Sequence, residues 1–351
     1  MSFALLALMA CGARTDLGAP RPISGSDGGT DAPPPPPPSI ACAAKERSVL
    51  SKGTSANADV RIDGSFVYWN DGARIVRVPK TGALTPEVVV DGAVDWGAYD
   101  VSPSGVVFSA HGSSQVKRAD GAVLGAVSRP SVEVVATSGT SVYVVAPQGT
   151  DEGVFSIASG AAQLVAILPL TATDSLGQGQ FPQAAYDLLV SGDFAFVSLI
   201  GHAPFPSKVL SVALDTGNVT TLSSMPLSLP GSTLALDSSS VYYASSFGQG
   251  APAIFAVNRA GGAEPAAVVP TPTYCASCAR AIVASDAKAI YFSSGEFGQN
   301  VSSWLPAQGG TPVLVYEAAI DAAVTGIRSD GTCVYWVVAG DPNVYAAPVA
   351  E

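Results

Sequence analysis

The stretch Asp63-Gly64-Ser65-Phe66-Val67-Tyr68-Trp69 couples a turn signal to a run of apolar and aromatic residues. Aspartate followed by glycine suits a tight hairpin, and valine, tyrosine and tryptophan favour β-strands. The same combination recurs along the chain. The aromatic-containing runs are Phe66-Val67-Tyr68-Trp69, Val106-Val107-Phe108, Val142-Tyr143-Val144, Phe194-Ala195-Phe196, Val241-Tyr242-Tyr243, Ile290-Tyr291-Phe292 and Val334-Tyr335-Trp336. The pattern predicts a repeat protein built from β-hairpins.

The seven runs recur at intervals that fit one structural unit. Between the marks Tyr68, Phe108, Tyr143, Phe196, Tyr242, Tyr291 and Tyr335 the intervals are 40, 35, 53, 46, 49 and 44 residues. Their mean, about 44, lies in the range of a four-stranded blade of a β-propeller. A third strand follows each run, and in the units before the last a second turn such as Lys80-Thr81-Gly82 and a fourth strand come after it. We therefore predict an all-β fold, a single seven-bladed β-propeller over residues 42–351 with four antiparallel strands in each blade.

The seventh unit is shorter than the others and stops after its third strand. A fourth strand for it can come from the other end of the chain, where Arg47-Ser48-Val49-Leu50-Ser51-Lys52-Gly53 precedes the first unit. An open ring would leave an exposed sheet edge, which is an aggregation hazard. We therefore expect this N-terminal strand to complete the last blade and close the ring.

The composition limits the possible functions. Hydrophobic residues make up 48% of the chain, which is enough for a sizeable core, and the 36 glycines and 27 prolines suit a protein with many turns. The balance of 17 Lys and Arg against 28 Asp and Glu argues against nucleic acid as a partner. Two histidines leave little room for histidine-based metal or acid–base chemistry, so we expect no metal and no cofactor.

The N-terminal residues indicate where the protein is targeted in the cell. Residues 1–10 are almost wholly apolar, too few to span a bilayer, and fit a signal peptide. The run Leu8-Met9-Ala10-Cys11 resembles the lipobox of bacterial lipoproteins, which implies cleavage before Cys11 and a lipid on that cysteine. Residues 11–41 include Pro33 to Pro38 and read as a disordered tether. Gly12 lacks the aspartate that retains enterobacterial lipoproteins in the inner membrane, so the resemblance favours the outer membrane, with the lipid as the sole membrane contact.

The repeats also resemble a family. Val67-Tyr68-Trp69, Val76-Arg77-Val78-Pro79-Lys80-Thr81-Gly82 and Cys333-Val334-Tyr335-Trp336 are similar to the degenerate propeller repeats of exported lipoproteins from myxobacteria and their relatives. The resemblance covers about residues 42–351. It implies an architecture and no activity, because that family is largely uncharacterised.

Four cysteines remain after Cys11 is assigned to lipid. Cys275 and Cys278 lie in the connection between the fifth and sixth units, where an exported protein favours a local disulfide. A redox centre or half a zinc site are the alternatives, and no second such pair is present to complete zinc coordination. We expect Cys42 and Cys333 to pair across the closed blade. Cys42 must then fold back beneath it, because second and fourth strands lie about 9–10 Å apart and a disulfide needs Cα atoms within about 7 Å.

Candidate binding residues are expected on the face formed by the loops between second and third strands. They are His111, Asp151, Glu152, His202, Phe205, Glu296 and Asp341. Carboxylates and imidazoles together could bind a cation or transfer a proton. The loops differ in length and share no spacing, so the ordinary interpretation is solvated loop residues, and we assign no catalytic role to any of them.

These observations favour a monomeric, lipid-anchored propeller that binds a protein, peptide or glycan without catalysis. One alternative is a propeller enzyme, a lyase or hydrolase acting on an extracellular polymer, which requires the histidines and carboxylates to converge. The other is a scaffold for envelope assembly, which requires an exposed apolar patch on a face or rim.

Overall fold

A computed structural model covers the chain and describes residues 48–53, 59–83, 85–128, 131–149, 151–158, 160–168, 183–201, 206–225, 231–245, 253–270, 280–281, 283–286, 288–294, 298–317 and 322–349. The chain divides into two units at Pro37 and Pro38, and all described residues belong to the second. Within them no helix is long and apolar enough to cross a membrane.

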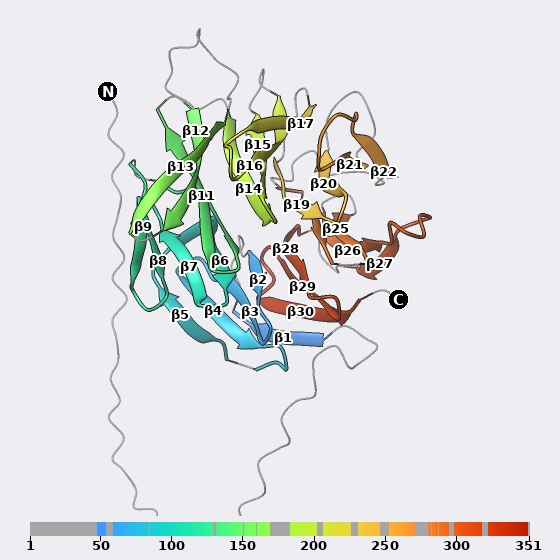
Figure 1. Cartoon of the computed structure of the whole chain (residues 1–351). Helices are drawn as coiled ribbons and strands as arrows, with labels where there is room; N and C mark the ends of the chain where they lie inside the picture. Colours follow the sequence, from blue (N-terminus) through green and yellow to red (C-terminus); the bar gives the residue numbers. More distant parts are fainter. Residues whose placement is uncertain are drawn as a thin grey trace, which may run out of the picture. The chain divides into compact units, whose positions relative to one another are not determined.

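The described strands form seven four-stranded antiparallel sheets arranged as the blades of a β-propeller (Figure 1). Blade 1 has β2 (Val60–Ile62), β3 (Phe66–Asn70), β4 (Arg74–Pro79) and β5 (Glu87–Asp91). Blade 2 has β6 (Val94–Ser102), β7 (Gly105–Ala110), β8 (Gln115–Arg118) and β9 (Val123–Ala126). Blade 3 has β10 (Val134–Ser138), β11 (Ser141–Gln148), β12 (Asp151–Ala158) and β13 (Ala161–Leu168). Blade 4 has β14 (Gln183–Ser191), β15 (Phe194–Gly201), β16 (Ser207–Ala213) and β17 (Val219–Met225).

The remaining blades repeat this order. Blade 5 has β19 (Leu234–Leu236), β20 (Ser240–Ser245), β21 (Ala253–Asn258) and β22 (Ala266–Pro270). Blade 6 has β24 (Val283–Ser285), β25 (Ile290–Ser294), β26 (Asn300–Trp304) and β27 (Val313–Tyr316). Blade 7 has β28 (Val324–Ser329), β29 (Cys333–Val338), β30 (Asn343–Pro348) and the N-terminal β1 (Ser48–Lys52). An extra parallel pair joins β18 (Gly231–Ser232) to β23 (Arg280–Ala281). The predicted fold class is confirmed.

The closure of the ring by the N-terminal strand is confirmed. β1 pairs antiparallel with β30, with Val49 opposite Tyr345 (Figure 1). Leu50 is buried in the cluster between blades 7 and 1, and its carbonyl accepts a hydrogen bond from Ala83 N–H in blade 1. A Cβ atom added at Gly326 would lie 2.8 Å from the backbone nitrogen of Val60, so glycine is needed where β28 approaches blade 1.

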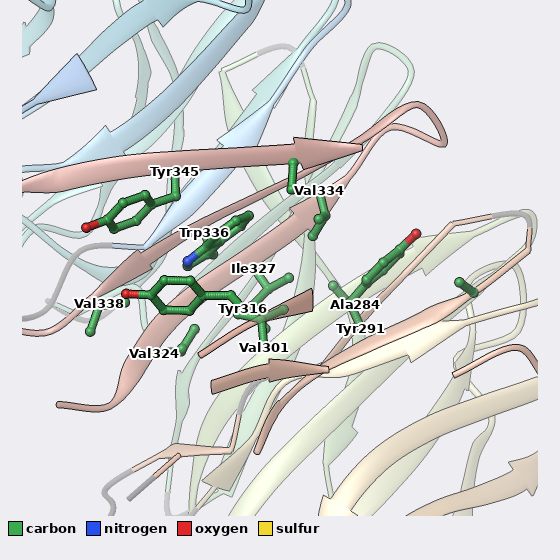
Figure 2. Packing of buried hydrophobic residues seen from close by; sticks show 12 residues of the cluster. Ala284, Tyr291, Val301, Tyr316, Val324, Ile327, Val334, Trp336, Val338 and Tyr345 are labelled. Carbon is green, nitrogen blue, oxygen red and sulfur yellow. The ribbon is translucent and has the colours of Figure 1, made fainter. Parts of the chain in front are cut away.

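The hydrophobic core is divided among the seams between blades. The described residues form seven clusters of buried side chains, and each cluster joins the facing sides of two neighbouring blades. Figure 2 shows the cluster between blades 6 and 7, where Trp336 is fully buried beside two tyrosines. Its ring lies 5.5 Å from Tyr345 in a stacked arrangement and 5.2 Å from Tyr316. The aromatic runs of the sequence therefore supply the packing that holds one blade to the next.

A recurring hydrogen-bond pattern explains the aspartate in the turns. In blades 1, 5 and 7 the turn aspartates Asp63, Asp237 and Asp330 each accept two backbone N–H groups of their own turn through Oδ1. Their Oδ2 atoms accept the hydroxyl of the tyrosine five positions on, at 2.7, 2.5 and 3.1 Å. The aspartate thus fixes the hairpin and its aromatic anchor together.

Candidate functional site

The antiparallel order of each blade gives the ring two different faces. The loops between second and third strands, with the connections between blades, emerge on one face, which we call the loop face. The turns between first and second strands and between third and fourth strands emerge on the other, which we call the turn face. The sequence placed its candidate binding residues on the loop face.

The described loop-face candidates are engaged in local contacts. His111 is well exposed, and its Nδ1 lies 2.7 Å from Asp95 Oδ1. Asp341 Oδ1 accepts the N–H of Asn343 at 2.9 Å, and its Oδ2 accepts the hydroxyl of Tyr345 at 2.5 Å. This carboxylate therefore stabilises the loop between β29 and β30, which is a structural role that its sequence position did not reveal.

The expectation that Asp151 and Glu152 are loop residues was wrong. Both belong to β12, where Asp151 pairs with Gln148 and Glu152 with Pro147 and Leu168. Glu152 is only 1% exposed, because β11 extends to Gln148 and the loop before β12 is correspondingly short. The sequence pattern does not show that β11 continues through Pro147 to Gln148, which is why the loop was expected to be longer.

Glu152 forms a carboxyl pair with Glu133, a residue that the sequence reading missed. Both side chains accept the backbone N–H of Ala185 in blade 4, at 3.2 Å from Glu152 Oε1 and 2.9 Å from Glu133 Oε2. Burial, and then the negative charge of Glu133, raise the pKa of Glu152 to about 9. Burial also raises the pKa of Glu133. Glu152 therefore keeps its proton at neutral pH, and the two side chains join blade 3 to blade 4 through Ala185.

An aromatic contact lies near this carboxyl pair. The rings of Trp96 on β6 and Tyr186 on β14 approach to 4.8 Å between their centroids. Gly97 follows Trp96 on β6, and its φ of +78° is a backbone conformation that favours glycine. A Cβ atom at this position would contact the carbonyl oxygens of Glu133 and Tyr186. Blades 2, 3 and 4 thus meet at the loop-face end of their inner strands.

Five charged side chains gather on or beside the inner strands around the centre of the ring. Arg61 Nη1 donates to Asp59 Oδ1 at 2.7 Å, and its Nε lies 3.4 Å from Asp100 Oδ1. Despite its burial, these two carboxylates raise the pKa of Arg61. Burial lowers the pKa of Arg328, and the positive charge of Arg61 lowers it further. Burial raises the pKa of Asp187.

These polar groups hold neighbouring inner strands together. Asp100 Oδ2 accepts the N–H of Thr137 on β10 at 2.7 Å, and Asp187 Oδ2 accepts the N–H of Leu234 on β19 at 2.7 Å. Ser285 on β24 accepts the N–H of Leu236 and donates to its carbonyl. The charges near the axis therefore serve the assembly of the ring, and removal of one partner would leave a buried charge unpaired.

Open space is found on the turn face, between blades. A groove of about 1200 Å³ lies between blades 5 and 6 and is lined by both turn aspartates, Asp237 and Asp286. A second groove of about 750 Å³ lies between blades 1 and 2, beside Asp63 and Tyr68. This face could not be preferred from sequence patterns, because the depth of a groove between two blades depends on how the neighbouring turns pack.

The outer strands carry exposed aliphatic side chains. They belong to several different blades and are Val49, Val88, Val123, Leu164, Ile167, Val313 and Leu314. Single exposed aliphatic residues are ordinary on protein surfaces. These residues are spread over the outer strands of five blades. The assembly-scaffold alternative requires one continuous apolar patch, and the described exposed aliphatic residues do not form one.

Several predicted site residues lie outside the described part of the chain. They are Cys11, Cys42, His202, Phe205, Cys275, Cys278 and Glu296. Cys333 is described and is buried at the start of β29, at 2% exposure, but its pairing with Cys42 stays a prediction. Among the described residues, no group of three or more His, Cys, Asp or Glu side chains could hold a metal ion.

Comparison with known proteins identifies similar folds. No protein-family model and no curated protein matches the sequence. Among solved structures, the chain is similar to virginiamycin B lyase from Staphylococcus aureus, with a TM-score of 0.59 and 13% identity over 87% of this chain and 99% of that one. It is similar to the Swd1 β-propeller domain from Myceliophteria thermophila, with a TM-score of 0.57 and 11% identity over 87% of this chain and 100% of that one. It is also similar to BamB from Moraxella catarrhalis, with a TM-score of 0.52 and 13% identity over 85% of this chain and 84% of that one.

At these identities the likeness shows the β-propeller fold alone. The similar structures include an enzyme, the lyase, alongside BamB and the Swd1 β-propeller domain. One fold hosts many functions, so the function has to be argued from the residues of this chain.

Proposed function

We propose that this chain is a non-catalytic binding protein of the bacterial envelope, anchored through a lipid on Cys11 and presenting its propeller to a protein, peptide or glycan. Support for the anchor comes from the sequence, in which the lipobox-like run is followed by a proline-rich tether and then the folded repeats. The resemblance to exported lipoproteins favours the outer membrane. The partner is met in the periplasm or at the cell surface.

The observation that carries the binding role is the pair of grooves on the turn face. The groove between blades 5 and 6, at about 1200 Å³, is larger than a small-molecule pocket requires and is open at the surface. Its walls are turns whose aspartates are fixed by backbone N–H groups and, for Asp237, by a tyrosine hydroxyl, so the surface is rigid before a partner arrives. A rigid groove of this volume, open at the surface, favours an extended polymer as the ligand.

The proposal is tested by purifying the full chain, with a C-terminal tag, from native envelopes after cross-linking. We expect a defined partner to co-purify with the wild-type chain, and we expect Cys11→Ser to release the chain from the membrane fraction. Incorporation of radiolabelled palmitate at Cys11 checks the lipid directly. Recovery of the chain without any stoichiometric partner, or without palmitate, contradicts the corresponding half of the proposal.

The carboxyl pair favours a second candidate function, a propeller enzyme acting on an extracellular polymer. A carboxyl that keeps its proton at neutral pH is the chemical requirement for a general acid. Against this, Glu152 is almost completely buried and binds the backbone of blade 4, which suits an interblade contact better than contact with a substrate.

The enzyme candidate is tested by incubating the wild-type chain with exopolymer from the native envelope and measuring new reducing or unsaturated ends. Glu152→Gln removes the acid while keeping the shape of the side chain. Product formed by the wild type and lost in this variant would establish the enzyme, and equal product from both, or from neither, would reject a role for the pair.

A further inference from the structure

The seam between blades 7 and 1 holds a lysine in a site built by a turn aspartate and its tyrosine. Lys80 Nζ lies 2.6 Å from Asp330 Oδ2 and 5.4 Å from the centre of the Tyr335 ring. Asp330 Oδ1 accepts the N–H groups of Thr332 and Cys333, so its Oδ2 is directed to the tyrosine hydroxyl and the ammonium. A turn aspartate and the tyrosine five positions later therefore form a binding site for an ammonium group within the repeat itself.

The seam between blades 5 and 6 repeats this receptor without the lysine. Asp237 Oδ1 accepts the N–H groups of Ser239 and Ser240 at 2.7 Å each, and Oδ2 accepts the hydroxyl of Tyr242 at 2.5 Å. Among the described residues, no ammonium or guanidinium lies within ion-pair distance of this carboxylate.

The difference between the two seams can be traced to one position. Val67 pairs with Val78 in blade 1, and Lys80 follows two residues later. At the same place in blade 6, Ile290 pairs with Trp304, and the residue two positions later is Pro306. Proline carries no charge, so the aspartate of blade 5 faces an open groove where the aspartate of blade 7 faces an ammonium.

The groove has the lining that a lysine side chain needs. Asp237 and Tyr242 lie in its wall, and Leu236, Leu305 and Pro306 supply apolar surface for the methylene stem of a lysine. Its volume of about 1200 Å³ far exceeds one side chain, and Gln308 adds an amide to the wall. The groove can therefore take a length of polypeptide around the lysine.

Two resident cations lie near the site. Arg259 Nη1 donates to the backbone carbonyl of Asp237 at 2.9 Å, and its guanidinium lies over the Phe196 ring of blade 4, so it is engaged at the seam between blades 4 and 5. Lys288 is exposed on the facing turn of blade 6 and also lines the groove. Within the described part of the chain its ammonium makes no ion pair, and its backbone N–H caps Asp286 instead. A partner lysine that enters the groove buries its methylene stem against the apolar wall. Lys288 is exposed on the solvent side and does not gain this apolar burial when its ammonium reaches toward Asp237.

We propose that the groove between blades 5 and 6 binds a lysine side chain on an extended segment of a partner protein, with Asp237 and Tyr242 as the ammonium receptor. This inference rests on the proposed binding function and names its site and the chemistry of its ligand. The occupant reproduces the contact that Lys80 makes with Asp330 and Tyr335.

The test is a calorimetric titration of the full chain with a blocked five-residue peptide that has lysine at its centre and alanine and glycine around it. We expect binding of this peptide and at least a tenfold weaker affinity when the lysine is replaced by norleucine or Nε-acetyl-lysine. Cadaverine supplies the ammonium and stem without the polypeptide, and it should bind at least tenfold more weakly than the peptide. Equal affinity for the norleucine peptide overturns the lysine assignment, and equal affinity for cadaverine overturns the polypeptide assignment.

Three variants locate the binding. Asp237→Asn keeps the oxygen that caps the turn and should weaken peptide affinity at least tenfold. Pro306→Lys copies Lys80 into the open seam and should block the peptide by the same factor. Asp330→Asn is the matched control, because its carboxylate already holds Lys80, and it should leave affinity within twofold. Wild-type affinity in both Asp237→Asn and Pro306→Lys overturns the site, and thermal melts verify that each variant is folded.

The same variants separate this inference from the proposed function. If a partner co-purifies from native envelopes equally with the wild type and with Asp237→Asn, the chain is a binding protein and the groove assignment is wrong. If no partner co-purifies with the wild type, the proposed function itself fails. Loss of the partner in Asp237→Asn and Pro306→Lys, but not in Asp330→Asn, supports both.

Discussion

Replacement of Glu152 by glutamine should stabilise the protein, although it removes a buried side-chain contact. The unfolded carboxyl loses its proton near pH 4.5, and the folded carboxyl keeps its proton until about pH 9. Between these values the folded state binds more protons than the unfolded state, so the free energy of unfolding falls as pH rises. At pH 7 this lowers the free energy of unfolding by at most about 3.5 kcal/mol, from about 1.4 kcal/mol per pKa unit over the roughly 2.5 units between 4.5 and pH 7.

The glutamine variant avoids that cost and keeps the geometry. Its amide oxygen can accept the N–H of Ala185, as Glu152 Oε1 does, and its amide nitrogen can donate to the carboxylate of Glu133. The predicted gain over wild type is therefore close to zero at pH 4 and up to about 3.5 kcal/mol at pH 7.

Urea unfolding at pH 4, 5.5, 7 and 8, followed by tryptophan fluorescence, measures the gain directly. Asp151→Asn, at the neighbouring half-exposed position of β12, is the control and should show no gain that grows with pH. A Glu152→Gln variant that is less stable than wild type at pH 7, or a gain that does not change with pH, would refute the conclusion that Glu152 is protonated in the folded protein.

Other perturbations test the ring itself. Trp336→Ala should cost about 3–5 kcal/mol in chemical denaturation, because the seam between blades 6 and 7 loses its central ring. Removal of residues 42–53 should expose the edge of β30 and cause aggregation, measured by light scattering, whereas a soluble product of equal stability would contradict closure. Lys80→Met should lower the free energy of unfolding, measured in urea, by about 1–2 kcal/mol, because the Lys80 ammonium and the Asp330 carboxylate are both largely buried. Burial opposes the lowered pKa of Asp330, but hydrogen bonds from Lys80 and the turn N–H groups outweigh it. The ionised Asp330 carboxylate therefore stabilises the folded state above about pH 3.8, and this contribution is lost as the pH falls below that value. In Asp330→Asn the free energy of unfolding should depend less on pH in that range, as measured by urea unfolding.

The repeat could be predicted because each blade repeats a local signal. Asp330 and Tyr335 are five residues apart, and the hydrogen bond between them lies within a single hairpin. Blades 3 and 4 have Ser138 and Ser191 at the aspartate position, so their signal was weaker. The aromatic spacing still identified these blades, because the packing of a blade against its neighbour requires bulky residues whatever the turn chemistry is.

The functional groups could not be predicted in the same way, because they depend on contacts between blades. Glu133 meets Glu152 through the approach of blade 4 at Ala185, and no sequence spacing encodes that approach. The Asp237 carboxylate faces an open groove because Pro306 stands where blade 1 has Lys80, a difference that becomes meaningful only when the strands are placed in register. The fold of each blade can therefore be predicted from local sequence patterns, whereas the candidate sites depend on contacts between neighbouring blades.

The most direct test of the binding account is photo-cross-linking in intact envelopes from a benzophenone amino acid placed at Ser238, an exposed residue in the wall of the groove between blades 5 and 6. The same probe at His111, exposed on the loop face, serves as the comparison. The account predicts a defined cross-linked protein from Ser238, which disappears when Asp237→Asn or Pro306→Lys is added. Absence of a product from Ser238, or a product that persists unchanged in both variants, would contradict it.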